Sequence, residues 1–302
     1  MKRCRTTAAP DVPRELPASI PGGADASRAR PVKTRLSLLG AVLGAALVAI
    51  NLVGAFDTLR APEVDGYVDF AGTATDGAGQ TLAKLEALPA DPAAFAVAAE
   101  ATRIIHDGIA HVSSADIEAR GLSHFGMRVP VTENWVLFAL SFLKPDTYRD
   151  YEFCSYERAI ERGTGRCGQQ SLALVSFLEE RGFETGFVAL GGHAIATART
   201  EESGWVLLDP DYGGVIPFDL AQAEAGAEDL LSYYWTEVAR DNRIDRLYSP
   251  EGNRLRLGGV SARYARACPI EEAAYLAKWL VPLALFLPAL WLAWRSRKNE
   301  PY

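Results

Sequence analysis

The sequence predicts an α+β domain flanked by two transmembrane helices. A helical pattern is followed by three short runs of strand type, which predict an antiparallel sheet. These runs cover residues 183–190, 193–200 and 204–210. Two apolar segments, residues 36–56 and 275–294, enclose the pattern, and each is long enough to cross a hydrocarbon core of about 30 Å. Finally, Cys167 stands where the helix begins rather than on its apolar face.

The first apolar segment runs for 21 positions without a charge. A cleaved signal peptide is the alternative, with residues 53–55 as a cleavage site. However, the 35 preceding residues are far longer than a usual signal-peptide n-region. We therefore expect an uncleaved anchor over residues 36–56. Residues 1–35 are rich in Pro, Ala, Arg and Ser and lack periodicity, so they are expected to form a disordered basic tail.

The second apolar segment, residues 275–294, holds one charge, Lys278, close enough to its edge to snorkel. Its two prolines, Pro282 and Pro288, are better tolerated in membrane helices than in soluble ones. A buried core helix is the alternative interpretation. We favour a membrane span because only a short basic tail, residues 295–302, follows it.

The charge distribution predicts the orientation. Residues 1–56 carry eight Lys/Arg and three Asp/Glu, whereas residues 279–302 carry three and one. Because the whole chain has a net charge of −7, residues 57–278 carry −14. By the positive-inside rule both termini are cytoplasmic, and the domain at residues 57–274 is extracytoplasmic. Nothing basic in that domain suggests nucleic acid as a partner.

Three of the four cysteines, Cys154, Cys167 and Cys268, belong to this domain, and Cys4 lies in the tail. An odd number in a disulfide-permitting compartment leaves at least one free thiol. A Cys154–Cys268 bridge with Cys167 left over is one arrangement, but the sequence leaves the pairing open. A zinc site made of Cys154, Cys167 and His193 lacks the close ligand pairing of structural sites, so no metal is expected.

Helices are predicted before the strands. The first starts at Asp91-Pro92, an N-cap followed by proline, and keeps helical spacing to about residue 112. His106 and His111 lie in this helix, five positions apart. Because this separation does not place both on one face, a paired metal site is not expected there. The remaining helices are expected over residues 133–143, 155–163 and 167–182, the second of these with Ser155 as N-cap.

The other segments give weaker patterns. Residues 57–90 are expected to form a loose linker with one short strand. After Pro217 the pattern returns to helix over residues 218–239. Residues 240–268 show no clear period and are expected to lead the chain back to the membrane. The core of the domain is therefore expected at about residues 130–240.

Three polar residues stand at the ends of these elements. Cys167 opens a buried helix, His193 opens the second strand after two glycines, and Asp209 ends the third strand. A thiol becomes a nucleophile when a helix N-terminus and an imidazole favour its thiolate. The imidazole in turn needs an acceptor on its other nitrogen, which a carboxylate supplies. Neighbouring strands of a hairpin would bring His193 and Asp209 together.

The stretches "GTGRCGQQSLALVSFLEERGFETGFVALGGHAIATA" and "GWVLLDPDYG" resemble the core of the transglutaminase-like superfamily, which is related to papain-type thiol enzymes. Cys167, His193 and Asp209 match the family's cysteine at a helix start, histidine beginning a strand and aspartate ending the next strand. The accompanying residues that match are Gly165, Gly182, Trp205 and Pro210. The upstream part from residue 133 is similar to uncharacterised bacterial members associated with surface-polysaccharide loci.

The resemblance implies an α+β thiol-enzyme fold in which the catalytic cysteine sits at a helix N-terminus packed on an antiparallel sheet. It also implies attack on an amide of a peptide or protein through a thioester, with a bacterial plasma membrane as the location. Many members carry an aromatic residue where Ile195 stands, so hydrolysis is favoured over acyl transfer. No cofactor is implied, and the sequence contains no calcium-binding loop of recognisable spacing.

Some roles stay open. Asp211 competes with Asp209 for the role of the acid, because both lie in "DPDYG". The backbone N–H of Cys167 is the first candidate oxyanion donor. Asn134, Tyr151 and Gln169 are candidates for a second donor or for a supporting role.

Two other classes of function compete with an enzyme. One is a catalytically inactive, membrane-tethered module that binds a peptide or glycan in the cleft. The other is a structural subunit of an envelope or polysaccharide assembly, docked through its membrane helices.

Overall fold

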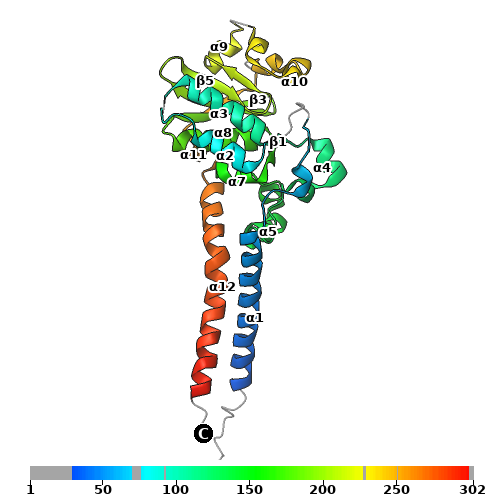
Figure 1. The fold of residues 1–302 in the computed structure, drawn as a ribbon, viewed down its shortest axis with the longest axis vertical. Coiled ribbons are helices and arrows are strands. Elements are labelled where there is room, and N and C mark those ends of the chain that lie inside the picture. Colours follow the sequence, from blue (N-terminus) through cyan, green and yellow to red (C-terminus); the bar gives the residue numbers. More distant parts are fainter. Residues whose placement is uncertain (1–28, 70–75, 92, 227–228, 250, 299–302) are drawn as a thin grey trace, which may run out of the picture.

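A computed structural model describes residues 29–69, 76–91, 93–226, 229–249 and 251–298. Two long helices extend side by side from one end of a mixed helix and sheet domain (Figure 1). Residues 1–28 of the disordered tail predicted over residues 1–35 lie outside the described residues, whereas residues 29–35 are helical instead of disordered.

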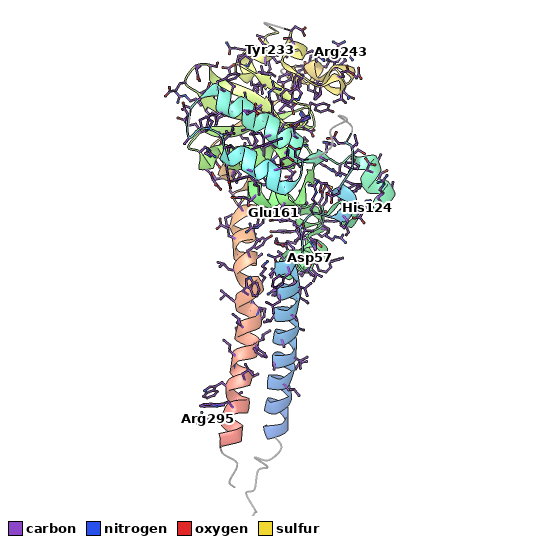
Figure 2. All side chains as sticks on the ribbon, in the orientation of Figure 1. Asp57, His124, Glu161, Tyr233, Arg243 and Arg295 are labelled. Atoms are coloured by element: carbon purple, nitrogen blue, oxygen red, sulfur yellow. A yellow bond between two sulfur atoms is a disulfide. The ribbon has the colours of Figure 1, made fainter. Side chains whose placement is uncertain are left out.

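The two long helices are α1 (Ala29–Phe56) and α12 (Ala267–Lys298). Both contain stretches long and apolar enough to cross a membrane, and only 11% of each stretch is buried. This exposure disfavours the alternative of buried core helices. A Cβ on Gly44 would lie 2.8 Å from the Pro282 carbonyl oxygen, so glycine permits the close approach of the two helices. Asp57 lies at the domain end of α1 and Arg295 lies towards the far end of α12 (Figure 2).

Five antiparallel strands form the main sheet, in the order β6-β5-β4-β3-β7. The three predicted strands are confirmed as β3 (Thr185–Leu190), β4 (His193–Thr200) and β5 (Gly204–Asp209). The sheet is extended at its two edges by β6 (Gly214–Ile216) and β7 (Arg254–Leu257). The expectation that residues 240–268 merely lead back to the membrane is therefore wrong.

The central helix is α8 (Cys167–Glu180), which starts at the predicted residue. It packs on β3 and β4 and is buried from Gly168 to Leu178. Alternate strand residues divide between two cores. Phe187, Ala196 and Leu208 pack in the core that contains α8. Val188, Ile195 and Leu207 instead pack against the segment that contains Leu220, Tyr234 and Tyr248.

Two predicted helices end or break earlier than expected. The helix expected over residues 91–112 is α3 (Phe95–Gly108), and the chain then forms β1 (Ala110–His111). The helix expected over residues 218–239 is divided into short pieces because Gly226, at φ +66°, follows its first turn. These pieces are α9 (Leu220–Glu224), η3 (Leu230–Tyr233) and α10 (Glu237–Asp241). In the expected linker, residues 78–86 form a further helix, α2 (Ala78–Glu86), after η1 (Pro62–Val64).

The other predicted helices are confirmed as α5 (Trp135–Leu143) and α7 (Tyr156–Arg162). Ser155 caps α7 by accepting a hydrogen bond from the Arg158 backbone N–H, as expected for an N-cap. The remaining elements are short. They are α4 (Ser114–Arg120), η2 (Leu122–Phe125), α6 (Pro145–Tyr148), η4 (Ile244–Tyr248) and α11 (Gly259–Tyr264).

Near the long helices, α5 presents apolar side chains to the outside. Phe142 is 58% exposed and Leu143 is 76% exposed. The start of α5 contacts α12, because Trp135 Nε1 donates to the Lys278 carbonyl oxygen at 3.3 Å. The exposed apolar end of α5 therefore lies near the point where the long helices join the domain (Figure 1).

A disulfide joins Cys154 to Cys268, with the Cα atoms 5.6 Å apart. This is the pairing that the sequence left open, and it makes Cys167 the free cysteine among the described residues. The bridge ties the segment before α7 to the first turn of α12. Within the described chain, the Cys154–Cys167–His193 zinc set is excluded because Cys154 is oxidised.

Candidate active site

Cys167 is the first residue of α8, and its side chain is partly exposed. The two residues of β2 (Thr164–Gly165) precede it closely and pair in parallel with β1. A Cβ on Gly165 would lie 2.6 Å from the Gln169 Cβ, so the strand can pass so close to the first helical turn only at a glycine. The thiol therefore lies where β2, which is paired with β1, meets the closely packed first turn of α8.

Buried polar side chains hold the first turns of α8 in place. Ser171 Oγ donates to the Ala194 carbonyl oxygen at 2.9 Å, beside the start of β4. Gln170 Nε2 donates to the Ile109 carbonyl oxygen at 2.9 Å, beside β1. Because each bond is buried and would be costly to leave unmade, both fix the cysteine relative to the sheet.

His193 begins β4 after a two-residue hairpin loop. Gly191 and Gly192 have φ values of +54° and +110°, and Leu190 pairs with His193 across the loop. A tight loop with two positive φ values favours glycine at both positions. The predicted glycine pair thus fixes where the imidazole enters the site, and His193 is only 8% exposed.

Asp209 ends β5 and is 1% exposed. Its Oδ2 lies 2.9 Å from His193 Nε2 and accepts a hydrogen bond from the Tyr234 hydroxyl at 3.1 Å. Its Oδ1 accepts from the backbone N–H groups of Asp211 and Tyr212, each at 3.1 Å. Four donors therefore surround the buried carboxylate, which satisfies it as an anion.

These contacts favour the charged forms of both partners. Burial opposes the imidazolium, but the Asp209 carboxylate and the Cys167 thiol outweigh it and hold the pKa of His193 well above its usual value. Burial also opposes the Asp209 carboxylate. The charge and hydrogen bond of His193, together with hydrogen bonds from the Tyr212 backbone N–H and the Tyr234 hydroxyl, nevertheless keep the pKa of Asp209 below its usual value. The two directions agree and describe a buried ion pair.

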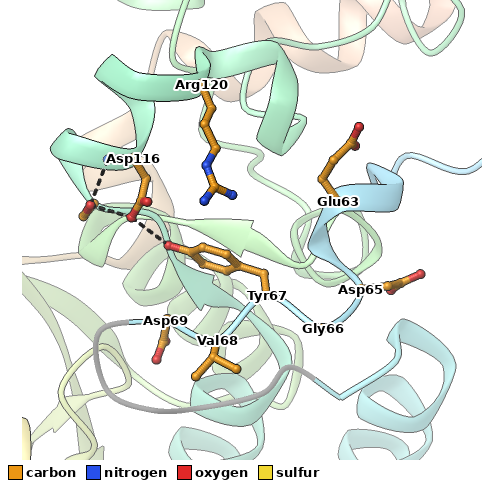
Figure 3. Close-up of a pocket in the computed structure, with 9 residues that line it drawn as sticks. Glu63, Asp65, Gly66, Tyr67, Val68, Asp69, Asp116 and Arg120 are labelled. Carbon is orange, nitrogen blue, oxygen red and sulfur yellow. Dashed lines mark hydrogen bonds between the residues drawn. The ribbon is translucent and has the colours of Figure 1, made fainter.

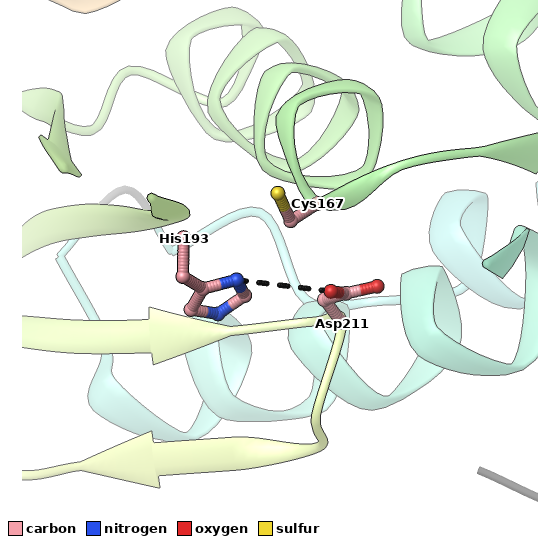
Figure 4. A group of neighbouring side chains, drawn as sticks. All are labelled: Cys167, His193 and Asp211. Carbon is pink, nitrogen blue, oxygen red and sulfur yellow. Dashed lines mark ion pairs between the residues drawn. The ribbon is translucent and has the colours of Figure 1, made fainter. Parts of the chain in front are cut away.

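Asp211 lies on the other side of the imidazole. Three possible ligand atoms lie within 4.8 Å of one another: Cys167 Sγ, a ring nitrogen of His193 and a carboxylate oxygen of Asp211 (Figure 4). Asp211 Oδ2 is 3.8 Å from His193 Nδ1, and Asp211 Oδ1 is 2.6 Å from His111 Nδ1. The Asp211 carboxylate therefore lies between two imidazoles, next to the thiol.

The structure thus brings together Cys167, His193, Asp209 and Asp211. It engages the other candidates elsewhere. Asn134 accepts hydrogen bonds from the Val136 and Leu137 backbone N–H groups and caps α5. The Tyr151 hydroxyl donates to Glu271, in the first turns of α12, at 2.9 Å.

Gln169 lies behind the helix start. Its Oε1 accepts from the Phe153 backbone N–H at 2.6 Å and from Arg162 Nη2 at 2.7 Å, while its Nε2 donates to the Phe153 carbonyl oxygen at 3.0 Å. Arg162 is fully buried, and desolvation lowers its pKa to about 10. These bonds support the first turn of α8 from within the protein core.

Two features of the site were not predicted. His111 was expected in a helix, and its place in β1 instead carries it to Asp211. Tyr234 reaches Asp209, and its hydroxyl lies 2.8 Å from that of Tyr248. A sign of the first was available in the sequence, because Ile109 is β-branched and follows Gly108, which could end the helix. No sequence pattern singles out the two tyrosines.

A separate surface pocket of about 520 Å³ lies around Tyr67 (Figure 3). The Tyr67 hydroxyl donates to Asp116 Oδ2 at 3.0 Å, and Asp69 Oδ2 accepts from the His111 backbone N–H at 3.3 Å. Cys167, His193 and Asp209 do not line this pocket. The pocket is therefore distinct from the Cys167 site.

No family model, curated protein or solved structure matches the chain. Comparison therefore assigns neither a family nor a fold family. What the structure itself gives is a Cys-His-Asp cluster that is compatible with a thiol enzyme, in a chain with two helices able to cross a membrane.

Proposed function

We propose that this chain is a membrane-anchored thiol enzyme of transglutaminase-like type that acts on amide bonds of peptides or proteins. The observation that carries the proposal is the arrangement of Cys167 at a helix start beside His193, whose Nε2 is held by the buried Asp209. This arrangement supplies a nucleophile, a base and an orienting acid.

In the proposed reaction, His193 accepts the proton of the Cys167 thiol through Nδ1, because Asp209 occupies Nε2. The sulfur then attacks the amide carbon, and the C=O electron pair moves to oxygen. The backbone N–H of Cys167, which has no helical acceptor at the first position of α8, faces the developing oxyanion. Collapse of the intermediate breaks the C–N bond, and His193 returns the proton to the leaving amine.

The resulting thioester joins the acyl group to Cys167 and is resolved by a second nucleophile. With water, His193 accepts a proton from the attacking molecule, the C–S bond breaks, and a carboxylic acid and the free thiol are formed. With an amine, the same steps yield a new amide. We favour water because Ile195 occupies the position where many transglutaminase-like proteins carry an aromatic residue.

The proposed location is a bacterial plasma membrane that the chain crosses twice, with both termini in the cytoplasm. Two observations support an extracytoplasmic domain. Residues 57–278 are acidic and the flanking segments are basic. The domain also contains the Cys154–Cys268 disulfide, which persists in oxidising compartments.

The test is the reactivity of Cys167 in the detergent-solubilised full chain. Iodoacetamide would be added at neutral pH, and the modification of the Cys167 peptide would be followed by mass spectrometry with glutathione as the reference thiol. We expect Cys167 to react about tenfold faster than glutathione, and His193→Ala to remove this advantage. The control is Asp245→Asn, which removes a carboxylate paired with Arg243 on the surface. Equal rates for Cys167 and glutathione would refute the proposal.

A further inference from the structure

We propose that Cys167, His193 and Asp211 form a zinc-binding site, in which the ion engages Cys167 Sγ, His193 Nδ1 and Asp211 Oδ2. The proposal concerns binding and does not require the protein to be a catalyst. It differs from the cysteine-based set excluded above, because the third ligand is a carboxylate and Cys154 has no part in it.

The distances suit a single small cation. The three ligand atoms lie within 4.8 Å of one another, and His193 Nδ1 and Asp211 Oδ2 are 3.8 Å apart. Ligands of tetrahedral zinc lie about 2.0–2.3 Å from the ion, which places neighbouring ligand atoms about 3.3–3.6 Å apart. Movements of about 1 Å or less would therefore bring all three into coordination.

A buried oxygen of Asp211 that makes no hydrogen bond points to a ligand at this position. Asp211 is 1% exposed, and its Oδ2 is buried without a hydrogen-bond partner. Leaving an oxygen of a buried carboxylate without a hydrogen bond is costly. By contrast, both oxygens of the neighbouring Asp209 are satisfied by hydrogen bonds. A cation between Asp211 and Cys167 would give this oxygen a direct partner, where the protein supplies only the 3.8 Å ion pair with His193 Nδ1.

The groups behind the ligands are also of the kind that accompanies zinc. Asp209 lies 2.9 Å from His193 Nε2, on the far side of the ligand imidazole. His111 Nδ1 lies 2.6 Å from Asp211 Oδ1, on the far side of the ligand carboxylate. Ligand histidines almost always donate their other N–H to a carboxylate or carbonyl, and ligand carboxylates are themselves hydrogen-bonded. Both outer contacts are in place here.

The ligand types favour zinc over harder ions. A thiolate and an imidazole select zinc or another soft transition metal, whereas Mg²⁺ and Ca²⁺ prefer oxygen ligands. On binding, the Cys167 S–H bond and the Nδ1–H bond of the His193 imidazolium break, the S–Zn and N–Zn bonds form, and the two protons are released to solvent. The thiolate and the Asp211 carboxylate then balance the two charges of the ion. Three protein ligands leave the fourth position for water or another small ligand.

The test uses Zn²⁺ and Co²⁺ with the full chain in detergent, purified without a histidine tag. Zinc affinity would be measured by competition with a chromophoric chelator. Co²⁺ would report a thiolate ligand through a sulfur-to-metal charge-transfer band. We expect one ion per chain, a charge-transfer band that Cys167→Ala abolishes, and protection of Cys167 from iodoacetamide by zinc.

Two variants separate a built site from incidental binding to a reactive thiol. His111→Gln keeps every ligand and is expected to weaken zinc about tenfold to a hundredfold by releasing Asp211. Asp211→Asn removes a ligand and is expected to weaken zinc further. Asp245→Asn is the matched control and should leave the affinity unchanged. Zinc affinity that is the same in Asp211→Asn, His111→Gln and the unaltered chain would overturn the proposal.

The result is independent of the proposed enzyme activity. If Cys167 proves no more reactive than glutathione but zinc still binds, the enzyme proposal fails and the zinc site stands. If Cys167 is highly reactive but the cobalt spectrum shows no thiolate band, the zinc site fails and the enzyme proposal stands.

Discussion

Removal of the Cys154–Cys268 disulfide should greatly destabilise the domain, and the size of the effect can be calculated from the structure. The bridge closes a loop with a sequence separation of 114 residues. In the chain-entropy description, a cross-link over a loop of this length lowers the entropy of the unfolded chain enough to contribute about 4.8 kcal/mol. We therefore expect the Cys154→Ser/Cys268→Ser double variant to lose about 4–5 kcal/mol of unfolding free energy.

Neighbouring noncovalent contacts sharpen this expectation. The Glu271 carboxylate accepts from the Tyr151 hydroxyl and the Cys154 backbone N–H, each at 2.9 Å, and from Arg158 Nη1 at 3.0 Å. In the folded state of the variant, these bonds should hold the start of α12 on the domain although the disulfide is absent. Because these bonds are absent from the unfolded chain, they do not replace the effect of the disulfide on the entropy of the unfolded chain. The variant should therefore keep its native structure while losing stability.

The assay is urea unfolding of the detergent-solubilised chain, followed by tryptophan fluorescence. With a slope of about 2 kcal/mol per molar urea, a loss of 4–5 kcal/mol lowers the midpoint by about 2 M. Mild reduction of the unaltered chain should give the same shift, which serves as the control for effects of the serines. A shift of the midpoint below about 0.5 M in both experiments would refute the loop-closure reasoning.

Three further outcomes follow from individual contacts. Tyr234→Phe removes a donor from Asp209 and should cost about 1 kcal/mol in urea unfolding and slow alkylation of Cys167. Tyr233→Phe, at the neighbouring partly buried tyrosine, removes no bond to Asp209 and should alter alkylation little. Gly165→Ala places a Cβ 2.6 Å from that of Gln169 and should cost about 1–3 kcal/mol, unlike the unobstructed Gly79→Ala. The exposed end of α5 should contact the bilayer: in liposomes, a fluorophore on Leu143→Cys, in a chain lacking Cys4 and Cys167, should be quenched by brominated lipid. A fluorophore on Ala221→Cys in α9 should not be quenched. Equal quenching at the two positions would contradict contact of α5 with the bilayer.

The centre of the fold was predictable because its signals are local. Short runs of strand type and the turns between them define β3, β4 and β5, and the periodic stretch after Cys167 defines α8. The edge strand β7 was not predicted, because its alternation of Arg and Leu covers only the four residues Arg254–Leu257, all of them exposed. Its pairing with β3 depends on a partner 65 or more positions away, which a local pattern cannot report.

The site was predictable only where it depends on neighbouring elements of the chain. Cys167, His193 and Asp209 stand at element boundaries, so their meeting follows from one helix and one hairpin. His111 reaches the site only because α3 ends at Gly108 and β1 pairs with the strand before Cys167. That pairing spans more than 50 positions and rests on two residues in each strand, too few to leave a recognisable period.

The two proposals share one site, in which catalysis and zinc binding cannot occur at the same time. Catalysis requires the Cys167 sulfur and His193 Nδ1 to be available to a substrate, whereas zinc would occupy both. Asp211 is not needed to orient the imidazole, because Asp209 already holds Nε2 with a fully bonded carboxylate. Asp211→Asn should therefore weaken zinc binding while leaving Cys167 reactive in the presence of a chelator. Loss of thiol reactivity in this variant, with zinc removed and the fold intact, would instead place Asp211 in the catalytic machinery.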